Sequence, residues 1–431
     1  MSTTASVRLH GLPAGRLSVS REGLLSFEYL PEWIAACTSP SRLPVHHALS
    51  TGMPVQPGVY GHEIAAPWFD GLLPDNARTR RTLAAHFQVD SSDDYGLLTS
   101  LGRECPGAVA IVPEDQAVSP EDGLRPEYEV LDEARVARHI RELPTRPLFV
   151  DADGELRLSL PGVHDKAAVL VVEGQVALPQ GATPTSHILK VDINGLPDSI
   201  RVENFCLLLA GALGMQVPRS RIHTAEDLHF MLIARYDRVV VAGQDFRYIR
   251  RVHQEDFCQA LQRFPREKYE KDNGPGWAEA FELMSKTVDP LEARNELLAR
   301  AIFQYLCGNP DAHAKNYSLV YEGKGLRLSK LYDLNNAAAF RPHYKEQRPR
   351  LAMSIGGERD PEKLEDRHWN DFARSIGFTP RFVQNRLMDL ARRLPDAARQ
   401  VEAKLVGTPG HSLLIGVAIE DMMTRCQKVL S

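Results

Sequence analysis

The chain has 431 residues, which is too long for one ordinary hydrophobic core, so its length predicts two or three domains or subdomains. Hydrophobic residues make up 43% and charged residues 25% of the chain, the usual range of soluble globular proteins. The net charge of −5 argues against a dedicated nucleic-acid binder, a class that is usually basic.

The cysteines and the hydropathy predict where the protein works. The six cysteines are scattered and form no CxxC pair, which suits a reducing compartment better than a disulfide framework or a zinc site. No signal peptide is recognised at the N-terminus, and no apolar run approaches the length of a membrane span. We therefore expect a cytoplasmic protein without membrane association.

The first quarter of the chain predicts short strands followed by helices. Residues 7–30 alternate as strands with glycine-rich turns between them, and Asp75 or Asn76 is expected to cap a helix running through Leu83. Residues 92–111 predict a helix that gives way to an apolar strand. The polar stretch 112–129 is then expected to be a linker.

The remainder predicts strands first and helices later. Strands are expected at 166–172, 175–179, 187–193, 228–241 and 246–252, with a helix at 198–215 that places residues 205, 208, 209 and 213 on one apolar face. Helical patterns dominate from residue 254, broken at 272–277. The predicted class is α+β, with an N-terminal subdomain at 1–111, a β-rich lobe at 112–252 and a helical lobe at 253–431.

Several common catalytic motifs are absent from the sequence. There is no GxxxxGK[ST], no strand-embedded GxGxxG, no HExxH and no GxSxG. These absences weaken the P-loop, Rossmann, zincin and α/β-hydrolase interpretations.

The stretch 308-GNPDAHAKNYSLVYEG-323 concentrates polar side chains between an apolar helix at 293–309 and a hairpin at 317–334. Its Asp311 and Asn316 have the spacing of the Asp and Asn in the kinase catalytic loop HRDxxxxN, and Asp333 follows where a kinase places a Mg²⁺-binding Asp. Phosphoryl transfer needs a carboxylate to accept the proton of the attacking hydroxyl and oxygen ligands for Mg²⁺. Asp311 is therefore the predicted catalytic base, and Asn316 and Asp333 are the predicted metal ligands.

Two further segments could serve a nucleotide. Residues 157–172 predict a strand, a Pro-Gly turn and a second strand, with Ser159, Gly162 and Lys166. Backbone N–H groups at this turn could face a phosphate, although for this motif alone an ordinary hairpin turn is the preferred interpretation. Lys190 ends an apolar strand and could pair with Glu203 of the next helix; the alternative is that Lys190 simply emerges at the strand end.

Two more residues of the loop leave alternatives open. No other His or Cys nearby completes a transition-metal ligand set with His313, so a role in positioning the loop is preferred. Lys315 either contacts a phosphate or is solvated.

Taken together, these residues resemble the HipA family of bacterial serine/threonine-protein kinase toxins. The resemblance rests on 159-SLPGVHDKAAVL-170, 183-TPTSHILK-190, 203-ENFCLLLAGALG-214, 234-ARYDR-238, 308-GNPDAHAKNYS-318 and 332-YDL-334, and on 67-PWFDGLLPDNARTRR-81 near the N-terminus. It implies a protein-kinase-like, two-lobed fold with an added N-terminal subdomain, and ATP and Mg²⁺ as cofactors.

The resemblance also implies roles for individual residues. Asp311 would be catalytic, Asn316 and Asp333 would bind Mg²⁺, and Ser159 would be autophosphorylated, which ejects the phosphate-binding loop and inactivates the kinase. The residues that would contact ATP are Gly162, Val163, His164, Lys166, Lys190, Arg235, Tyr236, Asp237, His313, Lys315 and Asn316. His164 stands where the family usually has Gln, and an imidazole titrates near neutral pH.

The implied function is that of the toxin in a toxin–antitoxin module. Its substrate would be an aminoacyl-tRNA ligase, glutamate-tRNA ligase in the best-known case, whose phosphorylation inhibits translation and promotes persistence. Its partner would be a HipB-like helix-turn-helix antitoxin, through which operator DNA is mainly contacted. The alternatives are a non-catalytic corepressor that binds HipB and operator DNA, and a kinase of small molecules.

Overall fold

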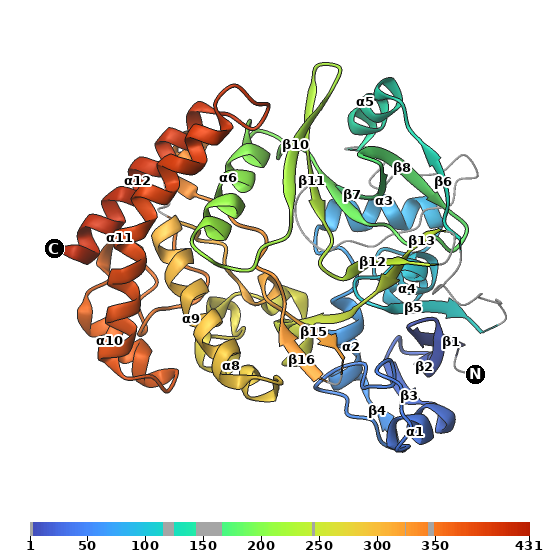
Figure 1. Cartoon of the computed structure of the whole chain (residues 1–431). Helices are drawn as coiled ribbons and strands as arrows, with labels where there is room; N and C mark the ends of the chain where they lie inside the picture. The colour runs from blue at the N-terminus through green and yellow to red at the C-terminus, as the bar shows by residue number, and fades with distance from the viewer. Residues whose placement is uncertain (1–2, 115–124, 144–165, 244–245, 324, 344–348) are drawn as a thin grey trace. The chain divides into compact units, whose positions relative to one another are not determined.

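The computed structural model describes residues 3–114, 125–143, 166–243, 246–323, 325–343 and 349–431. Two compact units share this chain and alternate along it (Figure 1). The first comprises 1–189, 234–266 and 318–326, and the second comprises 190–233, 267–317 and 327–431. Both helices and sheets are present, which confirms the α+β prediction. The three contiguous domains expected from the sequence stay a prediction.

The first unit begins with a five-stranded antiparallel sheet. Its strands lie in the order β4-β3-β2-β1-β5 and are β1 (Thr3–Leu9), β2 (Leu12–Val19), β3 (Leu25–Tyr29), β4 (Val59–Tyr60) and β5 (Val109–Pro113). Every second residue of β1 is buried, namely Ala5, Val7 and Leu9, as the period of a half-buried strand requires. The predicted strands of 7–30 are therefore confirmed.

Four helices belong to this N-terminal part: α1 (Pro31–Thr38), α2 (His62–Asp70), α3 (Ala77–Phe87) and α4 (Asp94–Leu101). Asn76 caps α3, because its side-chain oxygen accepts the N–H of Arg78 at 2.8 Å. Trp68 and Phe69 of α2 and Leu97 of α4 join the core that the sheet buries. The expected cap and helices are confirmed.

The expected linker 112–129 is wrong at both ends, because Val112 and Pro113 belong to strand β5. Residues Glu127–Val130 form strand β6, which pairs antiparallel with β8 (Gln175–Gln180). Three of the four residues of this strand are exposed and none is buried, so it carries little apolar signal and composition alone suggested a linker. In the same sheet, β7 (Lys166–Val172) lies next to β8, and β9 (His187–Lys190) lies next to β7. Helix α5 (Glu133–Glu142) follows β6 along the chain.

The predicted strand 228–241 is divided in two. It forms β11 (Leu228–Ala234) and β12 (Arg238–Ala242), with residues 235–237 between them outside any strand. The sequence did not indicate this break, because apolar residues stand on both sides of it. The residues between the two strands include Arg235 and Asp237, whose side chains are buried. β12 pairs with β13 (Arg247–Arg251), and β14 (His253–Asp256) precedes the short helix α7 (Phe257–Ala260).

Three histidines and a tyrosine form a ring cluster in the first unit. The Nε2 atoms of His10 and His47 lie 3.0 Å apart, and His47 stacks on Tyr321 with ring centroids 4.5 Å apart. His253 is fully buried beside His47, and its Nε2 lies 2.8 Å from the carbonyl oxygen of Leu49. Burial lowers the pKa of His10 to about 3 and that of His47 to about 4, with neighbouring cationic or histidine side chains adding to the effect in His10.

This cluster predicts that the fold weakens in mild acid. The folded pKa values lie below the unfolded value of 6.5, so the unfolded chain binds more protons, and the free energy of unfolding falls as pH drops below about 6.5. The loss should be roughly 1 kcal/mol per pH unit for each histidine that stays neutral. Urea unfolding between pH 7 and pH 5 measures it. His47→Gln should flatten the pH dependence and the exposed His86→Gln should not; equal slopes in both variants would contradict the prediction.

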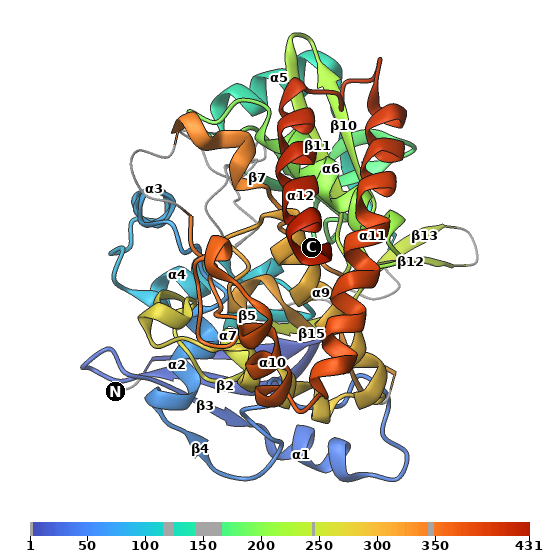
Figure 2. The same cartoon turned by 90° about the vertical axis from the view of Figure 1, so that its left-hand side faces the viewer.

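The second unit is largely helical. It contains α6 (Ser199–Ala212), α8 (Trp277–Leu283), α9 (Pro290–Cys307), α10 (Asp366–Ser375), α11 (Pro380–Leu405) and α12 (Leu413–Leu430), together with the hairpin β10 (Ser220–Ala225) and β11. Figure 2 shows α11 and α12 lying side by side in red. The expected apolar face of α6 is confirmed at Phe205 and Leu209 and wrong at Leu208, which is 36% exposed.

A small sheet uses the segment that follows α9 along the chain. β15 (Ser318–Glu322) lies between β14 and β16 (Gly325–Leu328) in a three-stranded sheet, so the predicted hairpin is confirmed. The expected break at 272–277 is also confirmed, because α8 starts only at Trp277. Within the described ranges, no helix is both long enough and apolar enough to cross a membrane.

Candidate active site

The loop that carries Asp311 follows directly on α9. The helix starts at the cap Asp289 and ends at Gly308, whose φ of +72° lets the chain turn away from the helix axis. A side chain at 308 would also lie 2.6 Å from Asp421 Oδ2 and 2.8 Å from Asn336 Nδ2. The glycine is thus required both by its backbone angle and by the close packing around it.

Asp311 presents its carboxylate to solvent, with the side chain 55% exposed. Its Oδ1 accepts a hydrogen bond from the hydroxyl of Tyr269 at 2.6 Å. The ring of His313 stands edge-on to Tyr269, and His313 Nε2 lies 4.0 Å from Asp311 Oδ2. An exposed, oriented carboxylate can receive a proton from an incoming hydroxyl, as a general base must.

His313 is buried against Tyr269 and beside the carboxylate, and the loop-positioning role expected for it stays a prediction. Lys315 is only 7% exposed, so the solvated alternative for this residue is wrong. The loop folds inward here because residues 314–316 form one turn of 3₁₀ helix, which turns the lysine toward the interior. Whether Lys315 meets a phosphate stays a prediction.

Asn316 is oriented by the backbone of Asp311. Its side-chain nitrogen donates to the carbonyl oxygen of Asp311 at 2.7 Å. Because the side-chain nitrogen of Asn316 makes this hydrogen bond, its amide oxygen is the atom that can bind a ligand. The five-residue spacing read from the sequence thus corresponds to a direct contact between the two residues.

Lys190, Glu203 and Asp333 meet around one buried ammonium group. Lys190 Nζ donates to Glu203 Oε1 at 2.6 Å and to Asp333 Oδ1, and the side chains of Lys190 and Glu203 are each 4% exposed. The possible pairing of Lys190 with Glu203 is confirmed. Burial alone would lower the pKa of Lys190, but the carboxylates of Asp333 and Glu203 outweigh it and raise the pKa above its ordinary value.

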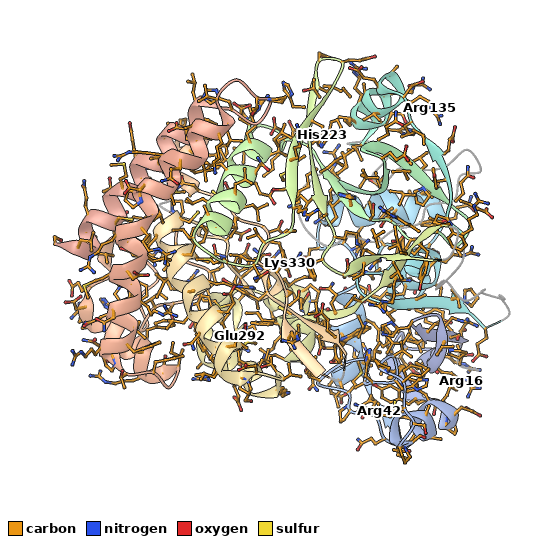
Figure 3. All side chains as sticks on the ribbon, viewed as in Figure 1. Arg16, Arg42, Arg135, His223, Glu292 and Lys330 are labelled. Carbon is orange, nitrogen blue, oxygen red and sulfur yellow. The ribbon has the colours of Figure 1, made fainter. Side chains whose placement is uncertain are left out.

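Asp333 lies five residues beyond β16 rather than at the end of that strand, where the sequence had placed it. Its backbone has φ +53°, in the left-handed region, which Asp adopts more readily than most residues. Lys330, labelled in Figure 3, lies on the segment that runs from β16 toward it. The strand is shorter than predicted because the chain must leave it to bring Asp333 to Lys190.

The oxygen atoms of Asn316 and Asp333 fit a Mg²⁺ ion by their chemistry. Mg²⁺ takes hard oxygen ligands, commonly one or two from protein and the rest from phosphates and water. Asn316 offers an amide oxygen whose nitrogen is already bonded, and Asp333 a carboxylate that is 34% exposed. Among the described residues no group of three or more His, Cys, Asp or Glu could hold a metal, so the fit rests on these two donors.

The other predicted ATP-contacting residues belong to the first unit. Arg235 binds Asp237 through Nε at 2.9 Å and Nη2 at 2.7 Å, and it also reaches Thr185 at 3.0 Å. Burial would raise the pKa of Asp237, but the Arg235 and Arg238 guanidinium groups outweigh it and hold that pKa well below its ordinary range. The charged side chains of Arg235 and Asp237 are thus engaged with each other, and the ATP contacts expected of residues 235–237 stay predictions.

The proposed phosphate-binding loop lies mostly outside the described residues. Ser159, Gly162, Val163 and His164 fall there, and Lys166 is the first residue of β7. Their predicted roles stay predictions.

Two residues of the site were missed by sequence reasoning. Tyr269 lies 42 positions from Asp311, and nothing in its neighbourhood signals a contact with the loop. Asn309 is 1% exposed and bonds to the backbone of both Asp311 and Asp333. The sequence did contain a signal for Asn309, because an Asn side chain often accepts a hydrogen bond from the backbone N–H two residues later, forming an Asx turn.

Comparison with known proteins agrees with this geometry. Residues 158–398 match the HipA-like C-terminal domain and residues 5–112 match the HipA N-terminal domain. "Putative kinase Y4mE" of Sinorhizobium fredii is 34% identical over 394 residues, covering 91% of this chain and 90% of that protein. "Serine/threonine-protein kinase toxin HipA" of Shewanella oneidensis is 29% identical over 341 residues, covering 77% and 75%.

Among solved structures, the chain resembles one from a complex of Shewanella oneidensis HipA, HipB and operator DNA. The TM-score is 0.83 and the sequence identity 25%, with 99% of this chain and 97% of that chain covered. The kinase-like fold expected from the sequence is therefore confirmed. Together with the two domain matches, which include the segments that carry Lys190, Asp311 and Asp333, the likeness shows that the chain belongs to the HipA family of serine/threonine-protein kinase toxins.

Proposed function

We propose that this chain is an ATP- and Mg²⁺-dependent protein kinase that phosphorylates serine or threonine. The observation that carries the proposal is the set of Asp311, Asn316, Asp333 and the Lys190–Glu203 pair in one compact unit. These are the parts that phosphoryl transfer requires of a protein, which must position the reactants and stabilise charge. Names of relatives add support, since both curated relatives given above are called kinases.

Each residue has a defined task in this proposal. Asp311 accepts the proton of the attacking hydroxyl, and Tyr269 keeps its carboxylate in one orientation. Lys190, held by Glu203, supplies a fixed positive charge for nucleotide phosphates. Asn316 and Asp333 would hold Mg²⁺, which when bound neutralises charge on the phosphates.

The substrate and the partner are proposed on weaker grounds. A HipB-like antitoxin is the proposed partner because the similar Shewanella HipA chain is found with HipB and operator DNA. An aminoacyl-tRNA ligase, with glutamate-tRNA ligase first, is the proposed substrate on family resemblance alone. A cytoplasmic location, where ATP and these partners occur, goes with the proposal.

Transfer of labelled γ-phosphate from ATP in the presence of Mg²⁺ tests the kinase activity. We expect label on the purified chain at Ser159 and on one of a panel of tRNA ligases. Ser159→Ala should lose the self-labelling but keep ligase labelling, and the exposed Ser41→Ala should keep both. A folded, ATP-binding chain that transfers nothing to itself, to ligases or to small hydroxyl compounds would favour the corepressor role. Transfer to small compounds only would favour the small-molecule kinase.

A further inference from the structure

The side chain of Asn309 links the two segments that carry the predicted catalytic carboxylates. Its Oδ1 accepts the backbone N–H of Asp311 at 3.1 Å, and its Nδ2 reaches the backbone carbonyl of Asp333 at 3.4 Å. The same Nδ2 donates to Gln304 Oε1 at 2.8 Å. One small amide therefore contacts the loop of the base, the segment of the metal ligand and helix α9.

These three partners fit an amide in only one orientation. Gln304 Oε1 and the Asp333 carbonyl are acceptors and face the NH₂ group, whereas the Asp311 N–H is a donor and faces the oxygen. Asn309 is 1% exposed and Gln304 is 2% exposed, so water does not readily replace a lost contact. The arrangement is specific to an amide at 309.

The backbone on both sides of Asn309 is tightly constrained. Its N–H donates to the carbonyl oxygen of Gln304 at 3.0 Å, which ties the start of the loop to the last turn of α9. Asp333, the far partner, has a left-handed backbone that is less favourable for a residue with a side chain and persists only when neighbouring contacts fix it. The hydrogen bond that its carbonyl accepts from Asn309 is one such contact, and the bond that its carboxylate accepts from Lys190 is another.

We propose that Asn309, held in place by Gln304, is a positioning residue that fixes the Asp311 and Asp333 segments relative to each other for phosphoryl transfer. This inference rests on the proposed kinase function. Asn309 touches neither nucleotide nor metal in it and acts through the backbone of the two residues that do. Small displacements of catalytic groups lower reaction rates strongly. Removal of the Asn309 side chain should therefore change turnover and Mg²⁺ dependence more than it changes the affinity for nucleotide.

The experiment compares Asn309→Ala and Gln304→Met with wild type and with Gln384→Met, a matched control whose amide binds Asn370 on the same unit. Asn309→Ala should lower kcat by about 10²-fold and raise the half-saturating Mg²⁺ concentration about tenfold, with KM for ATP changed less than about threefold. Gln304→Met should shift kcat and Mg²⁺ dependence in the same direction.

A second measurement does not depend on activity. Amide hydrogen exchange of Asp311, whose N–H is bonded to Asn309, should become at least tenfold faster in Asn309→Ala and in Gln304→Met, but not in Gln384→Met. Unchanged exchange, or kcat and Mg²⁺ dependence within twofold of wild type in Asn309→Ala, would overturn the inference. A wild-type chain without phosphoryl transfer would instead overturn the proposed function, and the exchange comparison would still decide whether Asn309 holds the loop. If Asn309→Ala does not fold, Gln304→Met gives the same comparison.

Discussion

Asp311→Asn should lower the rate of phosphoryl transfer by about 10³-fold while leaving the fold and ATP affinity nearly unchanged. The amide keeps the shape of the carboxylate and an oxygen for the hydroxyl of Tyr269, but it cannot accept the proton of the attacking hydroxyl. Because the side chain is 55% exposed, the substitution removes little buried interaction and stability should stay within about 0.5 kcal/mol.

Initial rates with saturating ATP and Mg²⁺ give kcat, and nucleotide titration gives the affinity. Asp272→Asn is the matched control, since its carboxylate is also exposed, lies on the same unit and is 4.0 Å from Lys271. A loss smaller than about threefold in Asp311→Asn would remove Asp311 from the role of base.

Lys190→Met should cost the fold about 3 kcal/mol of unfolding free energy and abolish nucleotide-dependent transfer. It leaves Glu203, 4% exposed, without the cation that compensates its charge, and it releases Asp333 from the same ammonium. Removing one partner of a buried ion pair lowers the free energy of unfolding by more than the intact pair contributes to it, because the remaining charge is buried without a counter-charge or solvation.

The double variant Lys190→Met/Glu203→Leu separates stability from function. Replacing both charges by apolar side chains should restore most of the lost stability, measured by urea unfolding, and none of the activity. Lys271→Met is the control, because that lysine is 56% exposed and its removal should change stability by less than about 0.5 kcal/mol. Recovery of activity in the double variant would show that Lys190 has only a structural role.

The sequence by itself determined the local part of the site. Three features depend only on neighbouring residues: the polar stretch after an apolar helix, the spacing of Asp311 and Asn316, and the hairpin that follows. The structure has α9, the loop and β15 where these features predicted them. The cap at Asn76 and the alternating strand β1 were predictable for the same reason: helix capping and the period of two are properties of short segments.

Only the tertiary structure decided which distant residues join that loop. Lys190 and Asp333 are 143 positions apart, and Tyr269 and Asp311 are 42 apart, so no local pattern encodes their contacts. The break in the predicted strand 228–241 and the buried state of Lys315 likewise depend on packing, which overrides the apolar pattern. The residues proposed to supply chemistry could be recognised by type and spacing. Their contacts Tyr269 and Gln304 became recognisable only in the folded chain, because folding brings their side chains to the loop.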